Sequence, residues 1–134
     1  MKHWWLSRPA WLQPACALAA LALVAGLFIG GAQPAAVGLF TEPWDKVAHA
    51  TVFAALAVML NIALQGAHLL HGKQSISRRI AWVLALLVAS VVGVADELHQ
   101  ANLPGRVAGW DDWLADTAGA GVGLAAWAWL QRRQ

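Results

Sequence analysis

The sequence is poor in charge. Lys, Arg, Asp and Glu together make up 12% of its 134 residues, whereas hydrophobic residues make up 60% and the mean hydropathy is +0.56. A soluble domain of this size carries about 25% charged residues. The deficit, combined with long uncharged runs, excludes an ordinary soluble domain and indicates a membrane protein.

Cysteine and compact metal-binding motifs are also scarce. Cys16 is the only cysteine, which excludes a disulfide framework within the chain, and we interpret it as a small buried apolar residue. No motif such as H-E-x-x-H occurs, so we predict no metal and no other cofactor. A weaker alternative uses His49, Asp96, His99 and Asp112 as metal ligands.

The sequence pI near 9.2 does not indicate a nucleic-acid partner, because the charges are segregated along the chain. Seven of the nine Lys and Arg lie before the first apolar run, between the second and third, or after the fourth. All seven Asp and Glu lie around the other two connections, where only Lys46 and Arg106 are basic. By the positive-inside rule, we expect both termini in the cytoplasm and the acidic residues at the periplasmic or exterior side.

Four apolar runs predict an all-α membrane protein with four transmembrane helices, at about 12–31, 45–66, 79–100 and 111–131. Each approaches the length of about 20 residues that a bilayer core requires, and an open backbone cannot face lipid. The short connections favour an up-down bundle that forms one domain over residues 1–134, in the bacterial inner membrane. We expect the first run to be retained, because it is long for the apolar region of a signal peptide.

Small residues recur in the fourth run, where Gly119 and Gly123 are four positions apart. This spacing lets helix backbones approach closely in lipid. Packing within the bundle is the favoured interpretation, and helix association between copies of the chain is the alternative.

Ionisable residues lie about one turn inside three of the predicted spans. With a rise of about 1.5 Å per residue, His49, Asp96 and Asp116 should all lie roughly 6 Å beneath the outer surface. Ionisable groups inside a span are costly and usually face a cavity or a partner. We therefore predict that the three residues meet in one polar pocket. Asp45 and Asp112 suit either the pocket or the stabilisation of a helix N-terminus.

The connection between the third and fourth spans reads NLPGR, a strong signal for a tight turn. Such a turn would present Arg106 over the acidic residues. Its guanidinium would either neutralise Asp96 and Glu97 or bind a phosphate or carboxylate. Lys46 is a candidate second cation.

Three segments together resemble a known family. DKVAHATVFAALAVML, VADELHQANLPGR and GWDDWLADTAGAGVG are similar to the VanZ-like family of small bacterial membrane proteins, over roughly two thirds of the chain. The pattern is D-K-x-x-H, then D-E-x-x-Q before P-G-R, then D-x-x-x-[ND]-x-x-G. It maps onto Asp45, Lys46, His49, Asp96, Glu97, Gln100, Pro104, Gly105, Arg106, Asp112, Asp116 and Gly119. Asp116 stands where the family often has asparagine. The resemblance implies a cell-envelope role linked to glycopeptide antibiotic resistance, and it names no reaction.

We expect an outward-facing pocket that binds or acts on a membrane lipid or a lipid-linked envelope precursor with an anionic headgroup. The expected catalytic residues are His49, Asp96, Glu97 and Asp116. The expected substrate-binding residues are Asp45, Lys46, His99, Gln100, Arg106 and Asp112. Both an enzyme and a binding protein fit this pattern. The alternatives are a small transporter or lipid flippase, and a structural accessory subunit.

Overall fold

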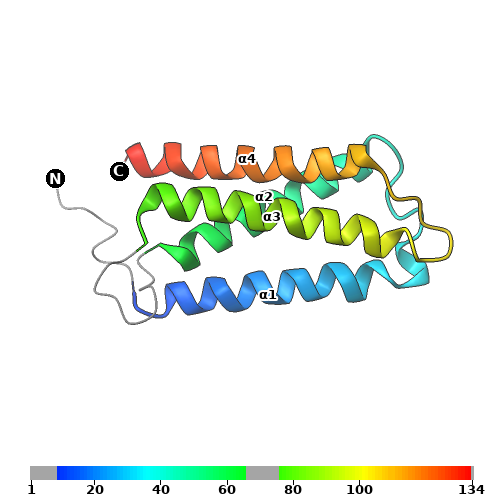
Figure 1. The fold of residues 1–134 in the computed structure, drawn as a ribbon, viewed down its shortest axis with the longest axis horizontal. Coiled ribbons are helices and arrows are strands. Elements are labelled where there is room, and N and C mark those ends of the chain that lie inside the picture. Colours follow the sequence, from blue (N-terminus) through cyan, green and yellow to red (C-terminus); the bar gives the residue numbers. More distant parts are fainter. Residues whose placement is uncertain (1–8, 66–75, 134) are drawn as a thin grey trace.

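The computed structural model describes residues 9–65 and 76–133, which form four long α-helices and one short 3-10 helix. These elements are α1 (Leu12–Gly31), η2 (Pro34–Ala36), α2 (Trp44–Leu64), α3 (Arg78–Gln100) and α4 (Trp110–Arg133). Successive helices run in opposite directions, so α1 begins and α4 ends at the same end of the bundle (Figure 1). The all-α prediction is confirmed, and the predicted helix bounds agree with the structure to within two residues.

The connection between α3 and α4 contains the predicted turn. The backbone N–H of Arg106 donates to the carbonyl oxygen of Leu103 at 3.2 Å, and Gly105 has a φ of +76°. That φ lies in the left-handed region, which glycine adopts without steric cost. The NLPGR motif therefore forms the tight turn that its sequence indicates.

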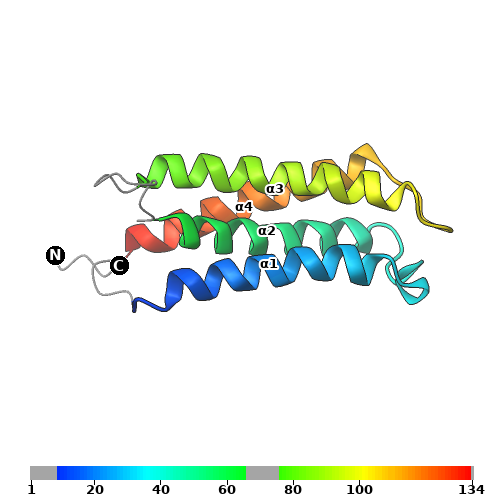
Figure 2. The same cartoon turned by 60° about the horizontal axis from the view of Figure 1, so that its bottom comes forward.

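Three helices of the described chain, α1, α2 and α3, are long and apolar enough to cross a membrane. The fourth, α4, is not in this set, because its first two turns carry acidic residues and its middle is rich in glycine. Helix α4 packs on α2 and α3 (Figure 2), and of these residues Asp116 and Gly119 are buried. The chain is thus a multi-pass membrane protein by its helix hydropathy. The fourth span and the orientation of the termini stay predictions.

The bundle is asymmetric, with α2 in contact with each of the other three helices. Helix α4 packs on α2 and α3, whereas α1 lies on the outside and packs mainly on α2 (Figure 2). The buried apolar core consists of Ala20, Phe53, Leu56, Ala57, Ala85, Ala89, Ala120 and Leu124. Ala20 is the only buried residue of α1. Most of the surface of α1 is therefore left for lipid.

The most extensive helix contact, between α2 and α4, depends on residues without side chains. A β-carbon at Gly119 would overlap the carbonyl oxygen of Ala50, and one at Gly123 would lie 2.7 Å from the carbonyl oxygen of Ala54. Both glycines thus face α2 of the same chain, as the favoured interpretation of their spacing requires. Association between copies through these glycines stays a prediction.

Replacing Gly119 by leucine should separate α2 from α4 and destabilise the protein. Overpacking costs about 1–3 kcal/mol in well-packed cores, and here the obstacle is backbone, which cannot rotate away. Gly121→Leu is the matched control, because a β-carbon at Gly121 meets nothing within 4 Å. The measurement is the thermal unfolding midpoint of the purified protein in detergent. Equal midpoints for the two variants would contradict the close packing described here.

Candidate functional site

We use "acidic end" for the end of the bundle that holds the α1–α2 and α3–α4 connections. A partly buried polar contact at this end joins α2 to α4. Nδ1 of His49 lies 2.9 Å from Oδ1 of Asp116. The Asp116 side chain is 0% exposed and the His49 side chain 19%. Gly93 on α3 makes room for this carboxylate, because a β-carbon there would lie 3.0 Å from Oδ2 of Asp116. Three helices therefore hold Asp116 in place, and Asp116 fixes the imidazole.

A cavity of about 200 Å³ opens beside this pair, between α1, α2, α3 and the two connections. Its polar wall consists of Asp45, His49, Asp96, Gln100 and Arg106. Its apolar wall includes Leu27, Leu39, Phe40, Val52 and Phe53. The structure thus brings five of the ten predicted site residues to one cavity. The combination of ionisable and apolar walls suits an amphipathic ligand.

Arg106 lines this cavity without a carboxylate partner among the described residues. Its Nη1 donates to the backbone carbonyl of Ala36 at 3.1 Å, and its Nε is buried with no hydrogen-bond partner. Asp96 instead accepts a hydrogen bond of 2.8 Å from Nε2 of Gln100. The guanidinium therefore does not neutralise Asp96, and its charge is available to a ligand.

Lys46 lies outside the cavity lining, in a group of carboxylates from the α1–α2 connection, α2 and α4. Its Nζ is 2.8 Å from Asp111 and 3.0 Å from Glu42, and it is 3.5 Å from Asp45 and 3.7 Å from Asp112. The positive charge of Lys46 is therefore offset by these four carboxylates of the protein. The predicted role of Lys46 in substrate binding stays untested, and this position does not favour it.

Glu97 and His99 also lie away from the cavity lining. Oε2 of Glu97 accepts a 2.7 Å hydrogen bond from the backbone N–H of Gly109, which joins α3 to the start of α4. The imidazole of His99 packs against Phe28 on α1, with ring centroids 5.1 Å apart. Glu97 nevertheless forms a group with His49 and Asp112, whose potential ligand atoms all lie within 4.8 Å of one another.

Two features of the site were not predicted from the sequence. One is Gly93, which provides the space for Asp116. An isolated glycine within a helix signals a close approach of another group, so the segment VVGVADE contained this information. The other is the apolar wall from the first connection, Leu39 and Phe40, for which the sequence offers no comparable signal.

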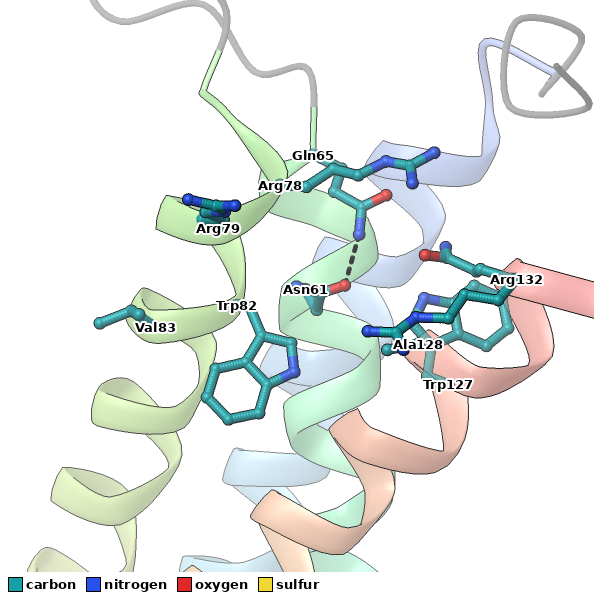
Figure 3. Close-up of a pocket in the computed structure, with 10 residues that line it drawn as sticks. Asn61, Gln65, Arg78, Arg79, Trp82, Val83, Trp127, Ala128 and Arg132 are labelled. Atoms are coloured by element: carbon teal, nitrogen blue, oxygen red, sulfur yellow. Dashed lines mark hydrogen bonds between the residues drawn. The ribbon is translucent and has the colours of Figure 1, made fainter.

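A second, larger cavity of about 470 Å³ lies at the opposite, basic end (Figure 3). Trp82 and Trp127 lie near Arg79 and Arg132 there, and Asn61 and Gln65 form a hydrogen bond on α2 (Figure 3). All seven acidic residues of the sequence belong to the other end. This basic cavity is therefore a rival location for an anionic ligand.

The apolar helices and the polar cavity at one end define the class as a small integral membrane protein with a site at the end of its bundle. The chain belongs to the VanZ/LLP1 family, whose family model matches residues 10–131. The resemblance stated from the three motifs is thereby confirmed. No curated protein and no solved structure matches the chain.

Replacing Asp116 by alanine should destabilise the protein by about 1–3 kcal/mol, because Nδ1 of His49 would lose its buried acceptor. Asp116→Asn retains an acceptor oxygen and should cost less. Asp111→Ala is the control, since its side chain is 58% exposed and exposed ion pairs contribute about 0–1 kcal/mol. Reversible denaturant unfolding in detergent measures these differences. A larger loss for Asp111→Ala than for Asp116→Ala would contradict the structural role of the pair.

Proposed function

We propose that the cavity at the acidic end binds the headgroup of a membrane lipid or lipid-linked envelope precursor, at the periplasmic or exterior side of the inner membrane. The observation that carries this proposal is Arg106, a partly buried arginine that lines the cavity without a carboxylate partner among the described residues and whose Nε is buried without a hydrogen bond. A guanidinium binds phosphate and carboxylate oxygens through paired N–H donors.

The carboxylates of the cavity narrow the class of headgroup. Asp45 and Asp96 line the same space as Arg106, and they would repel an anion that carried only phosphate oxygens. They are suited to accept hydrogen bonds from hydroxyl or amino groups. The preferred ligand therefore combines a phosphate with neighbouring hydroxyl or amino groups. Its hydrocarbon part would lie along the apolar wall that includes Leu39 and Phe40.

His49 gives the same site a group for proton transfer. Asp116 engages Nδ1 of its imidazole, which leaves Nε2 for a bound hydroxyl or water. A histidine oriented by a carboxylate is a suitable general base, because its ordinary pKa lies near neutral pH. We propose that His49 accepts a proton from the bound headgroup or from a water beside it.

The packing beneath the cavity favours a binding site over a transport path. Phe53, Leu56 and Leu124 are fully buried in the core that separates the cavity from the basic end. Farther along, the polar side chains are Asn61, near the end of α2, and Gln65, just after it. Charged residues that carry ions or protons across a membrane usually continue through its interior. This apolar layer supports a binding site at one face of the membrane and does not favour a path across it.

Arg106→Ala should weaken the binding of phosphatidylglycerol at least 10-fold, because the headgroup phosphate would lose its charged partner. Arg106→Lys keeps the charge but loses the bidentate geometry, so an intermediate affinity is expected. Native mass spectrometry of the protein, titrated with phosphatidylglycerol or with diacylglycerol of the same chains, measures the difference. Diacylglycerol, which lacks the phosphate, should show no dependence on Arg106.

Arg79→Ala is the matched control for this experiment, because Arg79 lies in the basic cavity (Figure 3). We expect it to leave the affinity unchanged. If the affinity falls in Arg79→Ala and persists in Arg106→Ala, the headgroup binds at the basic end and the proposal is wrong.

His49→Ala should abolish an envelope phenotype, measured as increased susceptibility of the source bacterium to a glycopeptide antibiotic. The expected reason is loss of proton transfer. Because the variant also leaves the buried carboxylate of Asp116 without its partner, its membrane abundance is measured by quantitative immunoblot, and the loss of phenotype should exceed any loss of abundance. A loss of phenotype in proportion to abundance would indicate a structural subunit instead.

A further inference from the structure

One mixed group of side chains at the acidic end has the composition and arrangement of a metal site. His49 on α2, Glu97 on α3 and Asp112 on α4 each offer one ligand atom, and these atoms lie within 4.8 Å of one another. Around a tetrahedral ion with bonds of about 2.1 Å, ligand atoms lie about 3.4 Å apart. Small side-chain rotations would therefore bring all three atoms to an ion.

Glu97 provides an independent sign that a cation belongs here. The residue is 8% exposed, and its Oε2 already accepts the hydrogen bond from Gly109. Its other oxygen, Oε1, is buried and has no hydrogen-bond partner among the described residues. Oδ1 of Asp112 is likewise buried without a hydrogen bond, and its one ionic contact among the described residues is with Nζ of Lys46 at 3.7 Å. Buried carboxylate oxygens without a hydrogen bond are costly, and a cation beside Glu97 and Asp112 would lower that cost.

His49 is held in the manner of a metal ligand. Metal-binding imidazoles almost always use their second ring nitrogen to contact a carboxylate or carbonyl, which fixes the tautomer and the ring orientation. Nδ1 of His49 makes such a contact with the buried carboxylate of Asp116. Nε2 is the nitrogen that remains for an ion, and while it coordinates an ion it does not accept a proton from a headgroup or water.

Lys46 is not placed to neutralise the buried carboxylate of Glu97. It makes its two shortest contacts with Asp111 and Glu42, whose side chains are 58% and 77% exposed. Its nearest approach to the group is 3.7 Å, to Asp112, and it forms no salt bridge with Glu97 within the described residues. The positive charge of Lys46 thus belongs to the rim of the acidic end, outside the group.

We propose that His49, Glu97 and Asp112 bind one divalent transition-metal ion, with Asp116 as a positioning residue for His49. One imidazole and two carboxylates suit Zn²⁺ or Mn²⁺. Three protein ligands leave a coordination position open, as in catalytic zinc sites. An oxygen of the bound headgroup or a water would occupy that position. This last step rests on the proposed function, whereas binding of the ion itself does not.

The test is isothermal titration of Zn²⁺, and separately of Mn²⁺, into chelator-treated full-length protein in nanodiscs. The wild type should bind one ion of at least one of the two metals per chain. Glu97→Gln should lower the affinity at least 10-fold, because it removes a charged ligand. Asp116→Asn should lower it by about 10–100-fold, the usual effect of losing a carboxylate behind a metal-bound histidine. Glu42→Gln is the matched control and should bind as the wild type does.

Two outcomes would overturn the metal site: no saturable binding of either ion, or equal affinities for Glu97→Gln and Glu42→Gln. Circular dichroism and size-exclusion profiles establish that each variant is folded. Native mass spectrometry with phosphatidylglycerol separates this inference from the proposed function. Lipid binding that depends on Arg106, without ion binding, refutes only the metal site. Ion binding that depends on Glu97, without lipid binding, refutes only the headgroup site.

Discussion

The close approach of α2 and α4 determines most of what lies at the acidic end. Gly119 lies against the backbone of Ala50, the residue that follows His49, and Asp116 lies one helical turn before Gly119. The contact between two small residues therefore fixes the register in which an imidazole meets a carboxylate. In lipid, apolar side chains gain little from leaving their surroundings, so close packing and interhelical hydrogen bonds hold helices together. Here Asp116 and Gly119, one turn apart on α4, provide both kinds of contact. The same segment therefore stabilises the fold and positions the site.

Charge at this end is arranged in two layers. The outer layer contains Lys46 and the exposed carboxylates around it, which offset one another. The inner layer contains Glu97 and Asp116, which are buried, together with the imidazole of His49 and the guanidinium of Arg106. The buried carboxylates of Glu97 and Asp116 raise the electrostatic cost of folding, and a bound cation would reduce that cost. Under the proposed metal site, ion binding and the stability of the bundle are linked through the inner layer.

Much of this architecture follows from simple rules applied to the sequence. The uncharged runs give the helix positions, Pro-Gly gives the turn before Arg106, and the helical rise places His49 and Asp116 at one depth. The partners of individual charges do not follow from these rules. Arg106 reaches the carbonyl of Ala36 because η2 folds beneath the turn, and Glu97 reaches Gly109 because α4 begins beside α3. Such contacts depend on loop paths, for which hydrophobic periodicity carries no information. The central position of α2 is also unpredicted, since the three most apolar runs, α1, α2 and α3, are nearly equal in hydropathy.

The peripheral position of α1 has a consequence for how a ligand reaches the cavity. This helix contributes one buried residue to the core and packs mainly on a single neighbour, yet Leu27 and Gly31 form part of the cavity wall. The wall on that side is therefore the one with the fewest contacts to break. An amphiphile could enter sideways from the bilayer by displacing α1, with its acyl chains still in the hydrocarbon. Entry by this route would restrict the ligands to molecules that already reside in the membrane, whatever the chemistry of their headgroups.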